Sequence, residues 1–480
     1  MKRRLLVVAL IAYLVAIFFF RPHATPGPQL RDFEAYYAAG QTWLRGGDPY
    51  ARDIWDAERS IPGVDARRNE LLPFVNPPPL LPVAALYARL PFGSAAIAWS
   101  ATLGLSLAIC IAALLALVGR TRDPTAWAAA VLAALAFGPI SSDLALGQFA
   151  LVGVAAMALA SLAFAREKHA RAAIAALVAG LQPTFVPALL AWSRDRRAIA
   201  AQVAGALAFL GVWALLARVG NVPSIGAYLQ LLHAHAWAEG LALIQFTPGA
   251  IAHALGASDA LAAALQWTVA AAALVSAAAI AWFRRDDPLA VFCAFCALTP
   301  LAFPFFHEHD FGLLFIPAFV VLTRSARGPA RVWTTIALLL VGIDWLGIGQ
   351  RPDGVAQTLL IALALTAATF GLVGVQRIRE FAPLLGAAIA IVAFGALAHG
   401  RALPIWPDAM LPFSVSPDAS VAQIWHAEQV AAGMFAPSAL SAGLRTLPLF
   451  GAALLTWLTA RRPTTALDSR TPSSVRAATL

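Results

Sequence analysis

Charged residues are scarce in this sequence: they make up 12% of its 480 residues, whereas hydrophobic residues make up 60%. A soluble domain usually carries about a quarter charged residues. So few charges cannot cover the surface of a soluble protein of this size, which excludes that class and indicates that lipid surrounds the chain. Backbone polar groups cannot be left unsatisfied in hydrocarbon, so the spans must be helices. The predicted fold class is an all-α polytopic membrane protein.

Cysteine is also scarce, and its placement excludes a disulfide framework. Cys110, Cys293 and Cys296 all lie inside apolar runs. The last two form a C-x-x-C pair, but a thiolate is strongly disfavoured in lipid, so packing is favoured over redox or metal chemistry. The distribution of basic residues excludes nucleic-acid binding. The net charge is +9, yet no run of Lys and Arg interleaves with aromatic residues on a soluble stretch.

Long apolar runs predict about twelve spans, since a helix needs about 20 residues to cross a bilayer. They lie near 5–20, 95–119, 126–140, 147–165, 196–218, 259–283, 288–303, 308–323, 331–347, 354–375, 381–400 and 445–461. The first run follows Lys2-Arg3-Arg4 and resembles a signal peptide, but it lacks an Ala-x-Ala cleavage pattern. We therefore interpret it as an uncleaved first span.

Two further apolar stretches do not fit as simple spans. The stretch 77–91 is bounded by prolines, and 170–192 is interrupted by Pro183 and Pro187. Most short connections between the runs are basic, and the positive-inside rule places such connections in the cytoplasm. All of them lie there only if 77–91 does not cross the membrane and 170–192 enters and leaves it on the cytoplasmic side. Threading both as full spans is the alternative, and it places basic loops outside.

The preferred topology has both termini in the cytoplasm and three large external loops, at 21–76, 219–258 and 401–444. None of these loops is long enough to form a separate domain. Residues 1–461 are therefore expected to be a single transmembrane domain. The Ser-, Thr- and Arg-rich segment 462–480 is expected to be a disordered cytoplasmic tail.

The first external loop carries an amphipathic pattern. Phe33, Tyr36, Tyr37, Gly40 and Leu44 follow the i, i+3, i+4, i+7 spacing of a helix. We expect this helix to lie along the membrane surface and to end at a Gly-Gly-Asp-Pro turn. Asp32 stands at its start, where an Asp often caps the helix and so acquires a lowered pKa. Glu34 is expected to be solvated.

Several short motifs, taken in order, resemble the GT-C membrane glycosyltransferases and particularly glycosyltransferase family 87. The most specific is an acidic residue after the first span, then an aromatic stretch and Gly-x-Asp-Pro-Tyr, here within residues 32–50. Weaker matches follow at Asn76-Pro77-Pro78, Gly147-Gln148, 179–184 and 245–250. The resemblance covers roughly residues 1–325. Asn76 stands where that family commonly has Tyr, and Gln182 where it usually has Lys.

The resemblance implies a GT-C-like fold and transfer of a sugar from a polyprenyl-phosphate donor to an extracytoplasmic glycan, lipid or protein. The phosphate is already a good leaving group, so no general acid is needed and one carboxylate suffices to deprotonate the acceptor. The resemblance assigns that role to Asp32, with inversion at the anomeric carbon. No metal or other cofactor is expected. The implied location is the plasma (inner) membrane of a bacterium, with the active site facing outward.

A second group of polar residues, Phe306-His307-Glu308-His309-Asp310, stands at the external start of an expected span. Four ionisable residues there are costly unless they face a polar cavity. His307, His309 and Asp310 are candidate substrate ligands, and interfacial hydrogen bonding is the alternative. A shared metal is disfavoured because His-x-His on a helix directs its side chains about 200° apart.

Other substrate-binding candidates are Tyr36, Tyr37, Gln182 and Gln245. Arg31, Arg45, Arg351 and Arg401 are external cations able to neutralise a phosphate. In the second loop His233, His235, Trp237 and Glu239 alternate with small residues. Trp237 and Tyr228 are suited to stack against a sugar, but an interfacial aromatic belt explains them equally well.

Two other functions remain open. A secondary transporter or lipid flippase also has about twelve spans and broken helices. It would need ionisable residues near mid-span, where Asp344 is the main candidate and lies close to an end. A scaffold subunit without activity is the third possibility.

Overall fold

Helices are the regular secondary structure of the part that the computed structural model describes, namely Leu6, Val8, Leu10, Tyr13, Leu403 and residues 30–61, 71–324, 329–351, 353–375, 377–401 and 413–461. The first half contains α2(Arg31–Leu44), α3(Asp53–Arg59), η1(Pro78–Leu80), α4(Leu81–Ala88), α5(Phe92–Leu117), α6(Pro124–Ala136), α7(Gly138–Leu146), α8(Ala150–Ala165), α9(His169–Ala179), η2(Val186–Trp192) and α10(Arg196–Val219). The second half contains α11(Ile225–Glu239), α12(Pro248–Ala254), α13(Asp259–Phe283), α14(Pro288–Ala302), η3(His309–Leu314), α15(Phe315–Arg324), α16(Pro329–Gly342), α17(Gly347–Gln350), α18(Gly354–Val373), η4(Ile378–Phe381), α19(Ala382–Ala398), α20(Val421–Ala431) and α21(Ala439–Ala460).

Nearly every apolar run coincides with a helix, but fewer of them are long enough to span a membrane than expected. Among the described residues six helices meet the length and composition of a span, and a seventh results if α6 and α7 form one span bent by 68°. The predicted number of about twelve is not confirmed. The reason is length: α8 has 16 residues, α14 has 15 and α16 has 14. Most of the first expected span, 5–20, lies outside the described residues.

The two proline-marked stretches form short helices, as their prolines predict. In 77–91 the chain makes η1 and the 8-residue α4, which is too short to cross. In 170–192 it makes α9 and η2, separated by the turn that contains Pro183.

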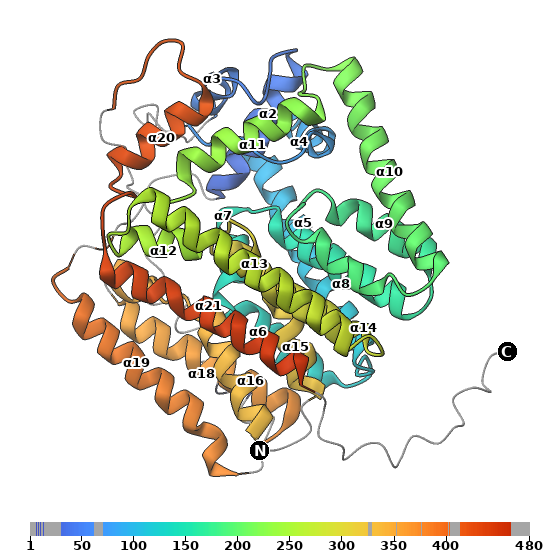
Figure 1. The fold of residues 1–480 in the computed structure, drawn as a ribbon, viewed down its shortest axis with the longest axis vertical. Coiled ribbons are helices and arrows are strands. Elements are labelled where there is room, and N and C mark those ends of the chain that lie inside the picture. Colours follow the sequence, from blue (N-terminus) through green and yellow to red (C-terminus); the bar gives the residue numbers. More distant parts are fainter. Residues whose placement is uncertain are drawn as a thin grey trace.

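The helices of the three polar loops gather at one end of the molecule, where α2, α3, α11 and α20 lie close together (Figure 1). The hydroxyl of Tyr228 donates to the carbonyl of Val75 at 2.6 Å. The carboxylate of Glu428 in α20 accepts a hydrogen bond from the backbone N–H of Leu71 at 2.8 Å. Segments far apart in sequence therefore build one polar end.

The basic connections around Arg284 and Arg324 lie close together, away from the polar end of the molecule. Arg284, at the end of α13, donates to the carbonyls of Thr459 and Ala460 at the end of α21, at 3.3 Å each. It also pairs with Asp287 at 3.0 Å, and Arg324 pairs with the same carboxylate at 2.9 Å. The ends of α13 and α21 that meet here lie apart from α2, α11 and α20 (Figure 1).

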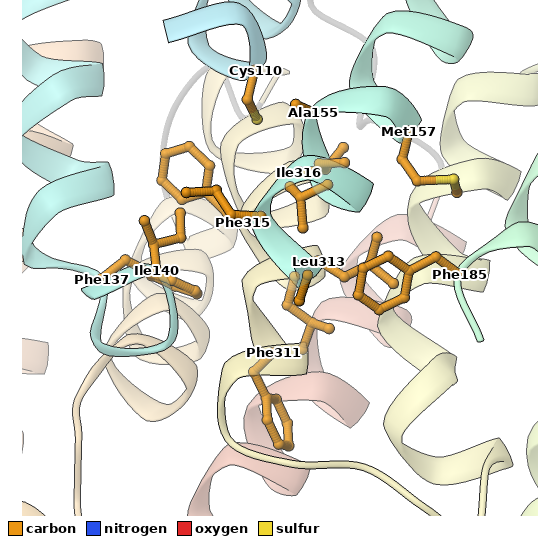
Figure 2. Packing of buried hydrophobic residues seen from close by; sticks show 14 of the residues in the cluster. Cys110, Phe137, Ile140, Ala155, Met157, Phe185, Phe311, Leu313, Phe315 and Ile316 are labelled. Atoms are coloured by element: carbon orange, nitrogen blue, oxygen red, sulfur yellow. The ribbon is translucent and has the colours of Figure 1, made fainter. Parts of the chain in front are cut away.

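The apolar core is centred on η3 and α15. Figure 2 shows Leu313, Phe315 and Ile316 from this segment surrounded by side chains of α5, α7 and α8, including Cys110, Ile140 and Met157. Large apolar side chains are exposed instead on the outer helices α10, α13 and α19, for example Leu207, Val275 and Leu385. An apolar exterior of this kind belongs to a protein surrounded by lipid, so the chain is a multi-pass membrane protein.

The predicted helix in the first loop is confirmed as α2, but its environment differs from the prediction. Phe33, Tyr36 and Tyr37 are buried, and so is Glu34, whose expected solvation is wrong. Gly40 packs so closely on α4 that an added Cβ would lie 2.5 Å from the carbonyl oxygen of Ala84. The helix is thus covered by protein on most sides.

Candidate functional site

Asp32 is held at the first turn of α2 by a glutamine from another part of the chain. The amide of Gln148 donates to Oδ2 of Asp32 at 2.6 Å, and its oxygen accepts from the hydroxyl of Tyr36 at 2.6 Å. Gln148 follows Gly147, which ends α7 with φ of 76°. The indole of Trp99 donates to the carbonyl of Gly147 at 2.7 Å, which fixes this turn.

The prediction that Asp32 caps α2 is wrong. The N-cap residue is Leu30, with φ of 70°, and no side chain caps the helix. Burial raises the pKa of Asp32, and this effect is only partly offset by Arg31, by the hydrogen bond from Gln148 and by His307. The carboxylate is therefore a stronger base than a capping aspartate would be.

The residues between α14 and α15 bring a second polar group toward Asp32. The backbone N–H of His307 donates to Oδ2 of Asp310 at 3.0 Å, and the amide of Gln182 donates to Oδ1 at 3.0 Å. Residues 303–308 are not helical, and the ring of His309 stacks on that of His307 with centroids 5.2 Å apart. The expectation that the two rings point in opposite directions is therefore wrong, because it assumed a helix.

The buried carboxylate of Glu239 contacts the ring of His307. Its Oε1 lies 3.2 Å from Nε2 of His235 and 3.4 Å from Nε2 of His307, and the amide of Gln245 donates to it at 3.0 Å. The indole of Trp425 donates to its other oxygen. Burial on its own would raise the pKa of Glu239, but the facing imidazoles hold it well below its usual range.

The acids around His307 set its charge, and Gln245 lies beside the same ring nitrogen. Burial lowers the pKa of His307, but Glu239, Asp310 and Asp32 together raise it above its ordinary value. The amide nitrogen of Gln245 lies 3.1 Å from the same Nε2, and a protonated His307 donates from this nitrogen to Glu239. The backbone N–H of Phe306 fixes the amide by donating to its oxygen at 2.8 Å.

The site has an accessible layer and a buried layer. Asp32, Gln148, Gln182, His307 and His309 each keep part of their surface exposed. The residues behind them, including Tyr36, Glu239, Gln245 and Asp310, are buried. A substrate reaching this end of the molecule would therefore meet one carboxylate, two amides and two imidazoles.

Asp143 is a buried acid of the site that sequence reasoning missed. It is 0% exposed, and neither carboxylate oxygen has a hydrogen-bond partner in the part of the chain that the structure describes. Its charge interacts with those of Asp310 and Asp32, and an added Cβ at Gly312 would lie 3.0 Å from its Oδ2. Its backbone carbonyl accepts from Gly147 and Gln148, each at 2.9 Å. The local signal was a lone acid four residues before a helix-ending glycine.

His307, His309 and Asp310 are the residues with the geometry of a metal site, since their ligand atoms lie within 4.8 Å of one another. Both oxygens of Asp310 and Nε2 of His307 already take part in hydrogen bonds. A metal would have to displace these partners. The expectation that no metal takes part stays a prediction.

Several other candidates lie apart from this cluster. The hydroxyl of Tyr37 donates to the carbonyl of Leu90 at 2.7 Å. Trp237 is 58% exposed and packs on His426, with centroids 4.6 Å apart. Tyr228 is buried against Tyr50 and Trp213. Arg45 and Arg401 are exposed, whereas Arg351 pairs with Asp344 at 2.5 Å.

Comparison with known proteins gives one match. Residues 74–304 match the family model described as glycosyltransferase family 87. No curated protein and no solved structure matches the chain. The matched segment contains Gln148, Gln182, Glu239 and Gln245 but begins after Asp32 and ends before His307. The first-loop motif, expected to be the most specific, is therefore outside it.

Proposed function

We propose that this chain, a membrane glycosyltransferase whose residues 74–304 match family 87, transfers a sugar from a polyprenyl-phosphate donor to an acceptor outside the cytoplasm. The acceptor is a glycan, a lipid or a protein, and the sugar is a hexose or pentose such as mannose. The observation that carries the proposal is the environment of Asp32. Its carboxylate is partly exposed, has a raised pKa, and is oriented by Gln148, which Tyr36 holds in turn.

In the proposed reaction the acceptor hydroxyl oxygen attacks the anomeric carbon while Asp32 takes its proton. The bond between that carbon and the phosphate oxygen breaks, and its electron pair stays on the phosphate. A single displacement of this kind inverts the anomeric configuration. A base whose pKa lies closer to the working pH is the better proton acceptor, and the raised pKa of Asp32 suits this role.

The surrounding side chains are suited to bind the two substrates. Gln182, His307 and His309 would contact the sugar or the phosphate, the buried Asp310 would position Gln182 and His307, and Arg31 would add a positive charge beside Asp32. Tyr36 and Gln245 act through Gln148 and His307 respectively. Side-chain amides form directional hydrogen bonds with sugar hydroxyls, and a protonated imidazole complements a phosphate.

The orientation that we propose puts this site on the outer face of a bacterial plasma membrane, with both termini in the cytoplasm. Two features support it. The basic connections around Arg284 and Arg324 gather away from the α2, α11 and α20 end (Figure 1), and clustered basic residues mark the cytoplasmic side. Lipid-linked sugars present their phosphate at the membrane surface, where such an end would lie.

The proposal is tested with purified protein, radiolabelled polyprenyl-phosphate mannose or arabinose, and membrane extract as the source of acceptor. Asp32→Asn should lower the transfer rate by about 100- to 10,000-fold, the usual contribution of a general base. Asp418→Asn, an exposed acid at the same end of the molecule, is the control and should transfer normally. Undiminished transfer by the Asp32 variant would exclude it as the base.

A secondary transporter is the other function that one observation favours. Asp143 is an ionisable residue in the bent pair α6–α7, and transporters place such residues at broken helices. The family match favours the transferase. Solute uptake into proteoliposomes without a glycosylated product would reverse this preference.

A further inference from the structure

The guanidinium of Arg445 is a buried cation with unused hydrogen-bond donors. It lies in α21, the residue is 4% exposed, and its Nε and Nη1 atoms have no hydrogen-bond partner among the described residues. The group packs over the ring of Phe246, 5.3 Å from the ring centre. Burying a charge without a hydrogen-bonded partner is costly. The position therefore favours the arrival of an anion.

Arg445 borders the candidate site through two separate segments. Phe246, beneath the guanidinium, follows Gln245, which contacts His307. Glu308, whose charge interacts with that of Arg445, stands between His307 and His309.

The other arginines near this end are already engaged or exposed. Arg351 donates to Asp344 at 2.5 Å and to Gln357 at 3.0 Å. Arg45 and Arg401 are exposed. Arg445 differs from them in combining burial with free donors. Its contact with Phe246 orients the guanidinium plane without using an N–H group.

We propose that Arg445 binds the phosphate of the lipid-linked donor and of the lipid phosphate that the reaction leaves behind. This inference rests on the proposed function. The phosphodiester of the donor carries one negative charge, and breaking its bond to the sugar places a second charge on the phosphate. A fixed guanidinium therefore stabilises the transition state more than the bound donor. Arginine suits this task because its planar donors match phosphate oxygens.

The test uses the full-length protein in detergent and measures the rise in Tm caused by a short-chain polyprenyl monophosphate. Arg445→Met should abolish that rise, and it should lower kcat at least tenfold. Its Tm without ligand should equal or exceed that of the parent, because an unpaired buried charge has been removed. Arg461→Met is the matched control: Arg461 makes the same kind of contact, 3.4 Å from the ring centre of Trp457, at the opposite end of α21.

Two further measurements test whether the ligand is a lipid phosphate and whether Glu308 opposes its binding. Inorganic phosphate at the same concentration should leave Tm unchanged, and an equal rise with it would overturn the assignment to a lipid phosphate. Burial raises the pKa of Glu308 to about 8, so the charge of this acid beside Arg445 is removed by Glu308→Gln only in a comparison made at about pH 9. At that pH the variant should bind the lipid phosphate severalfold more tightly. Unchanged or weaker binding in this variant would contradict an anion seated on Arg445.

The possible failures are distinguishable. If Arg445→Met lowers Tm without ligand and retains the rise with lipid phosphate, Arg445 is structural and the inference is overturned while the proposed function stands. If the parent protein neither binds the lipid phosphate nor transfers sugar, the proposed function itself has failed.

Discussion

Gln148 is the residue on which the chemistry of Asp32 depends most directly. Its amide joins Asp32 to Tyr36, and its hydrogen bond lowers the pKa of a carboxyl that burial raises. Gln148→Leu removes that bond, so the pKa of Asp32 should rise further. A base acts only when ionised, so the acidic limb of the pH–kcat profile should move to higher pH, and kcat at pH 7 should fall about 10- to 100-fold.

The pH profile distinguishes this role from a merely structural one. Gln202→Leu is the control, since the amide of Gln202 bonds Leu189 and Ser193 far along the chain from Asp32. It should leave both the rate and the profile unchanged. A Gln148→Leu enzyme with lowered kcat but an unmoved acidic limb would show that Gln148 does not act through Asp32.

At the scale of elements, the close contact of α2 with α4 sets the position of Asp32. An added Cβ at Gly40 would lie 2.5 Å from the backbone oxygen of Ala84, and backbone cannot move aside as a side chain can. Gly40→Ala should therefore cost about 1–3 kcal/mol of stability and displace the start of α2, lowering kcat as well as Tm.

Gly104 in α5 provides the matched substitution. A Cβ there meets nothing within 4 Å, and the residue is exposed on a helix. Gly104→Ala should be neutral or stabilising by up to about 1 kcal/mol, because alanine favours the helix. Equal effects of the two changes on Tm and kcat would contradict a specific role for the α2–α4 contact.

The docking of α20 onto the first loop should depend on pH through Glu428. This carboxyl accepts from the N–H of Leu71 at 2.8 Å, and burial, with Glu58 nearby, raises its pKa from 4.5 to about 9. The folded state therefore keeps a proton that the unfolded state loses above pH 4.5. Stability should fall as pH rises from about 4.5 to about 9, by up to about 1.4 kcal/mol per pH unit.

Glu428→Gln tests this sign, because the glutamine keeps an acceptor for Leu71 and cannot ionise. Its Tm should match the parent near pH 5 and exceed it at pH 8. Asp418→Asn, a change at an exposed acid just before α20, is the control and should follow the parent at both values. If raising the pH from 5 to 8 increases the Tm of the parent more than that of Glu428→Gln, ionisation of Glu428 stabilises the fold and the prediction is wrong.

At the scale of the whole molecule, the sequence predicted where helices form better than how many cross the membrane. Apolar runs mark helices because lipid forces backbone hydrogen bonds inside the segment. Their lengths are less informative. The run 147–165 became the 16-residue α8, and 308–323 became η3 and the 10-residue α15, which are buried in the core. Burial by neighbouring helices is a tertiary property.

The same limit applies to the site. His307, His309 and Asp310 are predicted because ionisable residues stand at the start of an apolar run, whereas Asp32, Gln182 and Gln245 are predicted from the family resemblance. Asp143 and Arg445 lie inside helices, and nothing in their local pattern shows that their polar atoms lack partners. The alternating pattern of the second loop contains Glu239, but the sequence favours the nearby Trp237 as the sugar-binding residue. Only packing shows that Glu239 is the inward residue.

The proposed orientation of the whole molecule is tested by labelling single cysteines in intact cells with a membrane-impermeant maleimide. The parent protein should give little background, because Cys110, Cys293 and Cys296 are 0% exposed. Asp418→Cys, at the exposed start of the α20 segment, should react from outside. Arg285→Cys, exposed beside the basic connections, should react only after permeabilisation. The reverse pattern would place Asp32 and its partners on the cytoplasmic side, where the proposed acceptors are absent.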